Sequence, residues 1–220
     1  MRAGLPEKGF AVIPGPFRAS DLKAAIGAYD HAVAAACPED CKEGSTSTRV
    51  NALLDRAPAF AAVLTHQPLI DAAVALIGGP FKLSAFHARS IRPGASAQAL
   101  HQDVAPGEDG WPLLGFILMV DPFEVENGAT RFLPGSADLP ALPEKSAPSD
   151  LEYACGPAGS LLLFEGLVWH GHGANITARW RRSVQGALIP KGARAAVDHR
   201  SYLRSELWSA LPPEARLLME

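Results

Sequence analysis

Two histidines and one aspartate are the side chains of this chain that best fit a metal site. His101 and Asp103 stand two positions apart, and His170 lies far downstream in a second segment. In an extended chain, side chains two residues apart point the same way, so the first pair can bind one ion together. Two imidazoles and one carboxylate, with other positions open, are the ligand set of non-heme Fe(II) oxygenases. The pattern therefore predicts an oxygen-activating metal centre.

The downstream segment strengthens the interpretation of His101-Gln102-Asp103 as part of a metal site, because an isolated His-x-Asp triplet is more often a surface pair. A strand-like apolar run over 161–164 leads through a short turn to His170 and then to Arg181, eleven positions further on. Such a segment can carry both a metal ligand and a cation into one barrel. We therefore expect a site built from two segments that are distant in sequence.

Composition narrows the classes of partner. The chain has 220 residues, 48% of them hydrophobic and 20% charged, which is enough for one core and predicts a single domain over 1–220. The net charge is -3 without charged blocks, so neither nucleic acid nor an anionic membrane is expected as a partner. The first residues lack a signal-peptide pattern, and no apolar run approaches the ~20 residues of a membrane span. We expect a cytoplasmic protein that acts on a small molecule.

Cysteine usage agrees with a reducing compartment. The three cysteines are odd in number, which argues against a disulfide framework. Cys37 and Cys41 have three residues between them, but no second pair completes a zinc site. We expect reduced thiols at all three positions, the third being Cys155.

The elements expected to position the site change character along the chain. Residues 1–80 are predicted to be a mainly helical layer, with helices over 22–36, capped by Ser20 and Asp21, and over 58–66 and 68–77. Residues 81–190 are predicted to be the β core, and 191–220 a helical tail. The expected strands are 81–91, 113–120, 130–133, 160–164 and 182–189, separated by Gly/Pro turns. Short strands after a helical start favour a double-stranded β-helix, a cupin-like jelly-roll, with flanking helices.

Several ordered motifs resemble those of the phytanoyl-CoA dioxygenase family. They comprise the opening Lys8 to Gly15, the triplet His101-Gln102-Asp103, the run Glu126 to Ser136, the run Trp169 to Asn175, and Arg181-Arg182. The similarity covers most of the chain, and three motifs in order are far more specific than one. The chain is thus similar to Fe(II)- and 2-oxoglutarate-dependent oxygenases on a double-stranded β-helix.

The resemblance implies a role for each motif residue. His101, Asp103 and His170 would bind Fe(II), and Arg181 would bind the far carboxylate of 2-oxoglutarate. Dioxygen would take a remaining position on the iron, with succinate and CO2 as co-products. A planar, permanently charged guanidinium can hold a carboxylate through two hydrogen bonds worth about 1.5–3 kcal/mol each, so lysine should be a poor substitute.

His172 departs from the family pattern, which commonly has a serine at this position. Its imidazole is on the same strand face as His170, so it can help to hold 2-oxoglutarate, replace His170 as ligand, or face solvent. We favour His170 as the ligand, because Asn175 and Arg181 keep the family spacing from it. Gln98 and Thr130 are further candidates for 2-oxoglutarate contacts, although either can instead satisfy a buried backbone group.

Other polar side chains receive plainer interpretations. Arg182 is next to Arg181 and should face away from it as a solvated charge. The remaining histidines show no partner spacing and are expected to be structural or surface residues; they are His31, His66, His87 and His199.

Reaction outcome and substrate are less directly encoded. Halogenating relatives have a small residue in the carboxylate position, so Asp103 predicts hydroxylation, or a related oxidation, of an unactivated C–H bond. Trp111 and Arg49 are candidate substrate contacts, and Arg49 or Arg56 could meet an acidic substrate. The segments 39–50, 105–111 and 134–150 are expected to shape the pocket, without a readable code for the substrate or for the oligomeric state.

Two other classes remain open from the sequence. A cupin-like metal-dependent hydrolase would use the same three ligands to activate water, but would not need Arg181 in the barrel. A non-enzymatic β-sandwich binding protein would carry the histidines incidentally.

Overall fold

Ten strands form two antiparallel sheets in this computed structural model, which describes residues 5–104, 111–142 and 148–220. The larger sheet has the order β1-β8-β5-β10-β4-β3-β2. Its strands are β1 (Phe10–Pro14), β2 (Cys41–Glu43), β3 (Ser47–Val50), β4 (Phe81–Ile91), β5 (Leu114–Met119), β8 (Ser160–Glu165) and β10 (Arg181–Pro190). Every residue of β5 and β8 is buried, because these central strands are covered on both faces.

The smaller sheet faces the larger one. It contains β7 (Glu152–Tyr153), β6 (Thr130–Phe132) and β9 (His170–His172), in that order. Phe10 of the larger sheet stacks on Phe132 of the smaller one with ring centroids 4.2 Å apart, so a shared apolar core joins the two sheets. Two facing antiparallel sheets with these crossovers form the predicted double-stranded β-helix.

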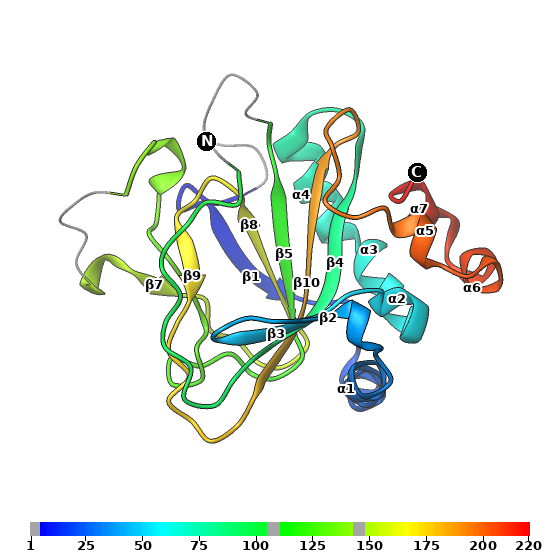
Figure 1. Cartoon of the computed structure of the whole chain (residues 1–220). Coiled ribbons are helices and arrows are strands. Elements are labelled where there is room, and N and C mark those ends of the chain that lie inside the picture. Colours follow the sequence, from blue (N-terminus) through cyan, green and yellow to red (C-terminus); the bar gives the residue numbers. More distant parts are fainter. Residues whose placement is uncertain (1–4, 105–110, 143–147) are drawn as a thin grey trace.

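Helices cover the outer face of the larger sheet, on the side away from β7 and β9 (Figure 1). Phe60, Leu64 and Leu69 are fully buried there against the sheet. The α-helices are α1 (Ala19–Ala34), α2 (Leu53–Arg56), α3 (Ala61–Leu64), α4 (Gln67–Ile77), α5 (His199–Tyr202), α6 (Ser205–Ala210) and α7 (Pro213–Leu217). Short 3-10 helices are η1 (Pro38–Asp40), η2 (Pro58–Phe60), η3 (Ser136–Asp138) and η4 (Pro148–Asp150).

The first eighty residues hold more β-structure than their helical periodicity indicates. Besides helices, they supply β1, β2 and β3 to the larger sheet. Helix α1 begins at Ala19 after Arg18, and no side chain caps it, so the cap predicted at Ser20 and Asp21 is wrong. The helix expected over 58–66 is divided into η2 and α3. Pairing with β4 and β8 therefore decides the structure of short segments whose own pattern is weak.

Whereas Arg181 faces the barrel interior, Arg182 lies on the helix-covered face of the larger sheet. Its guanidinium bonds both carboxylate oxygens of Asp30 on α1, at 2.6 and 2.7 Å, and is paired with Asp121 at 2.6 Å. The expectation of a merely solvated charge is wrong, because the residue links α1 to the sheet.

Among the described helices, none is by itself both long enough and apolar enough to cross a bilayer. Only the bent pair 58–64 and 67–77, with 48° between its parts, reaches that length and composition when the two are taken together.

Candidate metal and co-substrate site

The segment 98–103 runs alongside β9 and brings the side chains of His101 and Asp103 to the barrel interior. His101 and His170 exchange two backbone hydrogen bonds of 2.9 Å each, and the Asp103 amide donates to the Gly166 carbonyl at 2.8 Å. Because this pairing sets the register, His101 and Asp103 both face the first residue of β9. The two segments predicted to build one site are therefore neighbours.

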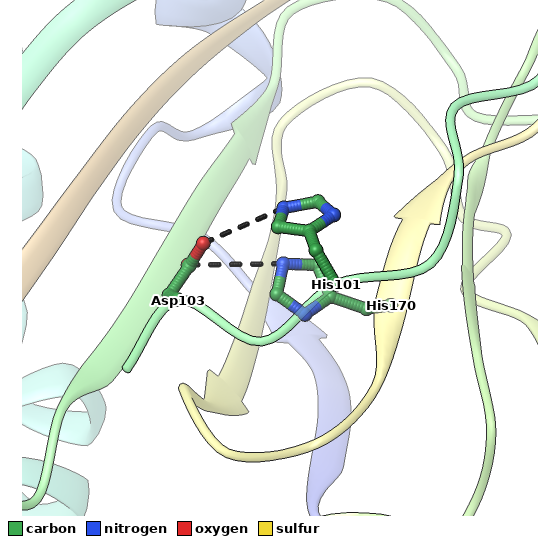
Figure 2. A group of neighbouring side chains, drawn as sticks. All are labelled: His101, Asp103 and His170. Carbon is green, nitrogen blue, oxygen red and sulfur yellow. Dashed lines mark ion pairs between the residues drawn. The ribbon is translucent and has the colours of Figure 1, made fainter. Parts of the chain in front are cut away.

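The three predicted metal ligands lie together. His101 Nε2 is 3.5 Å from Asp103 Oδ1, and His170 Nε2 is 3.7 Å from Asp103 Oδ2. One potential ligand atom from each residue lies within 4.8 Å of the others. Figure 2 shows both imidazoles presenting a nitrogen toward the carboxylate, His170 from β9 and the other two residues from the preceding segment. Their spacing and chemistry fit a single divalent metal ion.

Backbone carbonyls set the orientation of both imidazoles. His170 Nδ1 donates to the Val168 carbonyl at 2.8 Å, and His101 Nδ1 donates to the Ala99 carbonyl at 3.3 Å. Each Nδ1 therefore carries a proton, which leaves Nε2 as the nitrogen that faces Asp103 and that can bind a metal ion once it is deprotonated. Such outer hydrogen bonds are the usual way in which metal-binding histidines are held in one tautomer.

Burial and the neighbouring polar groups shift the pKa values of these three residues in opposite directions. Burial favours a neutral Asp103, but the hydrogen bond from His101 and the nearby His170 hold the pKa of its carboxyl below the ordinary value. The hydrogen bond to Asp103 raises the pKa of His101, whereas burial lowers that of His170. A carboxylate and a neutral buried imidazole are the protonation states that metal binding requires.

Arg181 carries an unpaired positive charge inside the same barrel. Its side chain is 1% exposed, and Nε and Nη1 have no hydrogen-bond partner among the described residues. The guanidinium carbon lies 4.0 Å from the centroid of the Phe123 ring. Burial, with Arg89 nearby, lowers the pKa of Arg181 to about 9. A buried guanidinium with free donors is a site for a carboxylate, which it can bind through two parallel hydrogen bonds.

His172 is turned to different partners from those of His170. Its Nε2 lies 2.9 Å from Thr46 Oγ1, and its Nδ1 donates to the Gly173 carbonyl at 2.8 Å. Burial lowers the pKa of His172 to about 4, so the ring is neutral at pH 7. His172 is outside the three-residue ligand group, a geometry that favours His170 as the third ligand.

All nine residues predicted for the site line one cavity of about 640 Å³. Trp111 and Arg49 lie in its wall with the metal and co-substrate candidates, and Thr130 is buried opposite His172 in the small sheet. The backbone of Gln98 makes two hydrogen bonds. Its amide donates to the His172 carbonyl at 3.0 Å, and its carbonyl accepts from the Arg131 guanidinium at 2.8 Å. The nine are His101, Asp103, His170, Arg181, His172, Gln98, Thr130, Trp111 and Arg49.

Further polar lining residues were missed from the sequence, among them His87, Arg89 and Gln185. His87 and Arg89 point inward from β4, and Gln185 points inward from β10. His87 was expected to be structural or on the surface, but it forms part of the cavity wall. Polar side chains at alternate positions of an otherwise apolar strand were the signal that could have found His87 and Arg89.

Other candidate features lie away from this group. A second cavity of about 860 Å³ is on the helix side of the larger sheet, between α1 and the segment 177–182. Cys37 and Cys41 are free thiols, as is Cys155, in agreement with the expected reduced state. Pocket contributions predicted for 105–110 and 143–147 lie outside the described residues.

A double-stranded β-helix with a His/Asp/His group and a buried arginine defines the class of the protein, and comparison then gives the family. Residues 5–183 match the model of the phytanoyl-CoA dioxygenase (PhyH) family, so the chain belongs to that family. The resemblance noted in the sequence is thereby confirmed.

Similar proteins support this assignment. Dioxygenase af480 of Aspergillus fumigatus is 28% identical over 99% of this chain and 75% of its own length. Four other curated dioxygenases are matched over only 36–64% of their length. HygX of Streptomyces hygroscopicus, solved with nickel, 2-oxoglutarate and hygromycin B, has a TM-score of 0.69 at 17% identity, covering 86% of each chain.

A second structural neighbour is an epimerase. The epimerase SnoN, solved with Fe3+, alpha-ketoglutarate and nogalamycin RO, has a TM-score of 0.67 at 19% identity, covering 84% of this chain and 80% of its own. At this identity, the two structural likenesses establish the jelly-roll fold.

Proposed function

We propose that this chain is an Fe(II)- and 2-oxoglutarate-dependent dioxygenase that oxidises a C–H bond of a small molecule. His101, Asp103 and His170 would hold the iron, and Arg181 would hold the far carboxylate of 2-oxoglutarate. The observation that carries the proposal is the pairing of a three-ligand group with an unpartnered, buried guanidinium in one cavity. Family membership agrees with it.

When bound together with 2-oxoglutarate, the metal would activate O2, with succinate and CO2 as co-products. The chain itself supplies orientation and exclusion of water. Phe132 and Phe164 pack on the His170 ring, with centroids 5.5 and 4.6 Å away, so one wall of the site is apolar. Arg181 would fix the direction in which 2-oxoglutarate enters, and His172 and Thr130 would contact it from the small sheet.

Hydroxylation is the outcome that we favour within this class. The Asp103 carboxylate would occupy the ligand position that a halide takes in a halogenating enzyme. A neighbour with the same fold is an epimerase, so the fold alone does not select the outcome. The local support for hydroxylation is therefore the aspartate itself.

The two rival classes are less well matched by the site. A hydrolase would need the metal and a water, but no unpaired, fully buried arginine beside them. A binding protein would need neither the ligand group nor its carbonyl-oriented imidazoles. Both are also at variance with membership of a dioxygenase family.

Succinate formation tests this proposal. Purified protein with Fe(II), 2-oxoglutarate and air is incubated with a metabolite library, and succinate is followed by NMR together with products that gain one oxygen atom. The Asp103→Ala variant should form no succinate, whereas Asp71→Ala, which removes an exposed carboxylate on α4, should behave as wild type. Equal succinate formation by wild type and Asp103→Ala would reject the assignment of the metal site.

A further inference from the structure

Two residues that adjoin the metal-ligand candidates in sequence make their contacts outside the cavity. Gln102 stands between His101 and Asp103, and Trp169 comes directly before His170. Side chains of an extended chain alternate in direction, and neither Gln102 nor Trp169 is among the described residues that line the cavity. Each of the two segments that carry ligand candidates therefore also has a hydrogen-bond donor on its outer face.

These two outer side chains donate to the same backbone carbonyl. Gln102 Nε2 lies 3.3 Å from the Leu139 carbonyl oxygen, and Trp169 Nε1 lies 3.2 Å from that same oxygen. A carbonyl oxygen has two lone pairs and can accept both bonds. Gln102 Nε2 also donates to the Leu167 carbonyl at 2.5 Å, in the turn that leads from β8 to β9. The Leu139 carbonyl thus joins the two segments that carry the ligand candidates.

Leu139 is itself positioned by a compact group of polar contacts. Its amide donates to the Ser136 carbonyl at 3.0 Å, at the end of η3. Ser136 is 1% exposed, and its hydroxyl donates to the Leu133 carbonyl at 2.6 Å and accepts from the Trp169 amide at 3.0 Å. The Leu133 amide donates to the Trp169 carbonyl at 2.9 Å. The turn over 133–139 is therefore bonded to the start of β9 through both main chain and side chains.

The segment that contains His101 and Asp103 has fewer main-chain bonds than a strand would have. In the described part of the chain, it pairs with β9 through an isolated bridge between His101 and His170 instead of a continuous ladder. The Asp103 amide adds one bond to the Gly166 carbonyl. Backbone with few such bonds opens more readily than the interior of a sheet. The side-chain bonds of Gln102 therefore contribute a large share of what fixes Asp103 relative to His170.

The separation of these two segments decides whether one ion can reach all three ligands. A movement of the segment 101–103 away from β9 would carry two of the ligand candidates away from His170. Metal and catalytic sites need their side chains within about 0.5 Å of the productive geometry. Outer hydrogen bonds that orient the ligands commonly change metal affinity by about 10–100-fold when they are removed. Contacts that hold the segments together should therefore be visible in metal binding.

We propose that Gln102 and Trp169 are positioning residues for the metal. By donating to the Leu139 carbonyl, they hold the segment 101–103 at the distance from His170 that a single ion requires. The proposal rests on the proposed function, because it treats the three-residue group as metal ligands. Both side chains act through the backbone that carries the ligands, so removal of either donor should weaken metal binding although all three ligands remain.

Binding of Co(II) tests the two residues one at a time. Co(II) accepts the same nitrogen and oxygen ligands as Fe(II), and the visible d–d absorption of the bound ion reports its coordination geometry. Gln102→Met removes the amide donor and keeps the length of the side chain, whereas Trp169→Phe removes the indole N–H and keeps an aromatic ring. Each variant should bind Co(II) about tenfold or more weakly in calorimetry, and should alter the d–d band, because the ligands are held less firmly.

Two matched variants control for the loss of a similar side chain elsewhere. Gln67→Met removes an amide that donates to Asp71 at 2.7 Å on α4, and Trp208→Phe alters a ring of α6 that lies against Arg200. Both should keep the wild-type affinity for Co(II) and the wild-type absorption. Urea unfolding of the metal-free proteins shows which variants fold, and Trp169→Phe decides the matter if Gln102→Met does not fold.

The outcomes separate this proposal from the proposed function. Folded Gln102→Met and Trp169→Phe proteins that bind Co(II) with the affinity and absorption of wild type, even with reduced stability, would overturn the positioning role alone. So would a loss of affinity no larger than that of the two control variants. A wild-type protein that binds no Co(II), or binds it no better than Asp103→Ala does, would overturn the metal site, and with it both the proposed function and this proposal.

Discussion

His170 and His172 share one face of β9, yet their Nε2 atoms have different partners. That of His170 lies 3.7 Å from Asp103 Oδ2, and that of His172 lies 2.9 Å from Thr46 Oγ1. The strand alternation explains the shared face, and the loop before β3 explains the difference, because it brings Thr46 to the second ring. One strand thus offers a candidate metal ligand and, two residues further on, an imidazole that is hydrogen-bonded to Thr46.

Paired substitutions of these histidines should therefore have different effects. His170→Ala should abolish Fe(II) binding, since one of three ligands is lost. His172→Ala should keep the metal and weaken 2-oxoglutarate binding, because only a candidate contact to the co-substrate is removed. Anaerobic calorimetry with Fe(II), then with 2-oxoglutarate, gives both quantities. Retention of full metal affinity by His170→Ala, with loss in His172→Ala, would exchange the two roles.

Arg181 should destabilise the protein in the absence of ligands and should be necessary for the binding of 2-oxoglutarate. Replacing a buried, unpaired guanidinium by methionine should raise the free energy of unfolding of the metal-free protein by about 1 kcal/mol or more, as removal of poorly compensated buried charge can do. The same variant should lose the stabilisation that 2-oxoglutarate gives to wild type. Urea unfolding with and without 2-oxoglutarate measures both, with the exposed Arg179→Met as control. Unchanged 2-oxoglutarate binding in Arg181→Met would place the anchor elsewhere.

Acid should destabilise the fold through its buried histidines. His199 on α5 is buried, and burial lowers its pKa from 6.5 to about 4. Between these values the unfolded chain binds a proton that the folded chain does not, so stability falls as the pH is lowered through that window. The slope is at most about 1.4 kcal/mol per pH unit for one histidine. Urea unfolding of metal-free protein from pH 7 to 4 should show a shallower decline for His199→Gln than for wild type.

The exposed His31 provides the control for that measurement. His31→Gln should keep the wild-type dependence of stability on pH. An equal slope in His199→Gln and wild type would show that the His199 ring is not buried in its neutral form.

Strong local patterns were predictable from the sequence. The strands β4, β5, β8 and β10 follow from apolar runs and alternation, and the metal group follows from His101, Asp103 and a distant His170. Short strands were not predictable in this way. β3 is mostly polar, and its strand conformation depends on pairing with β4 rather than on its own composition.

Charge balance in the site likewise depends on tertiary contacts. The isolation of Arg181 results from burial against Phe123, which comes from a distant loop. Arg49 and Arg89 become neighbours in the cavity wall only once β3 is in register with β4. Neither relationship has a signature in the local sequence.

Anaerobic titration with Fe(II) and 2-oxoglutarate, followed by visible absorption, tests the central claim most directly. The wild-type protein should develop a weak charge-transfer band that needs both additions and saturates at one equivalent of iron, because the metal and the co-substrate meet in one site. Asp103→Ala should not develop it. A wild-type protein that shows no such band, and that 2-oxoglutarate neither binds nor stabilises, would contradict the oxygenase assignment.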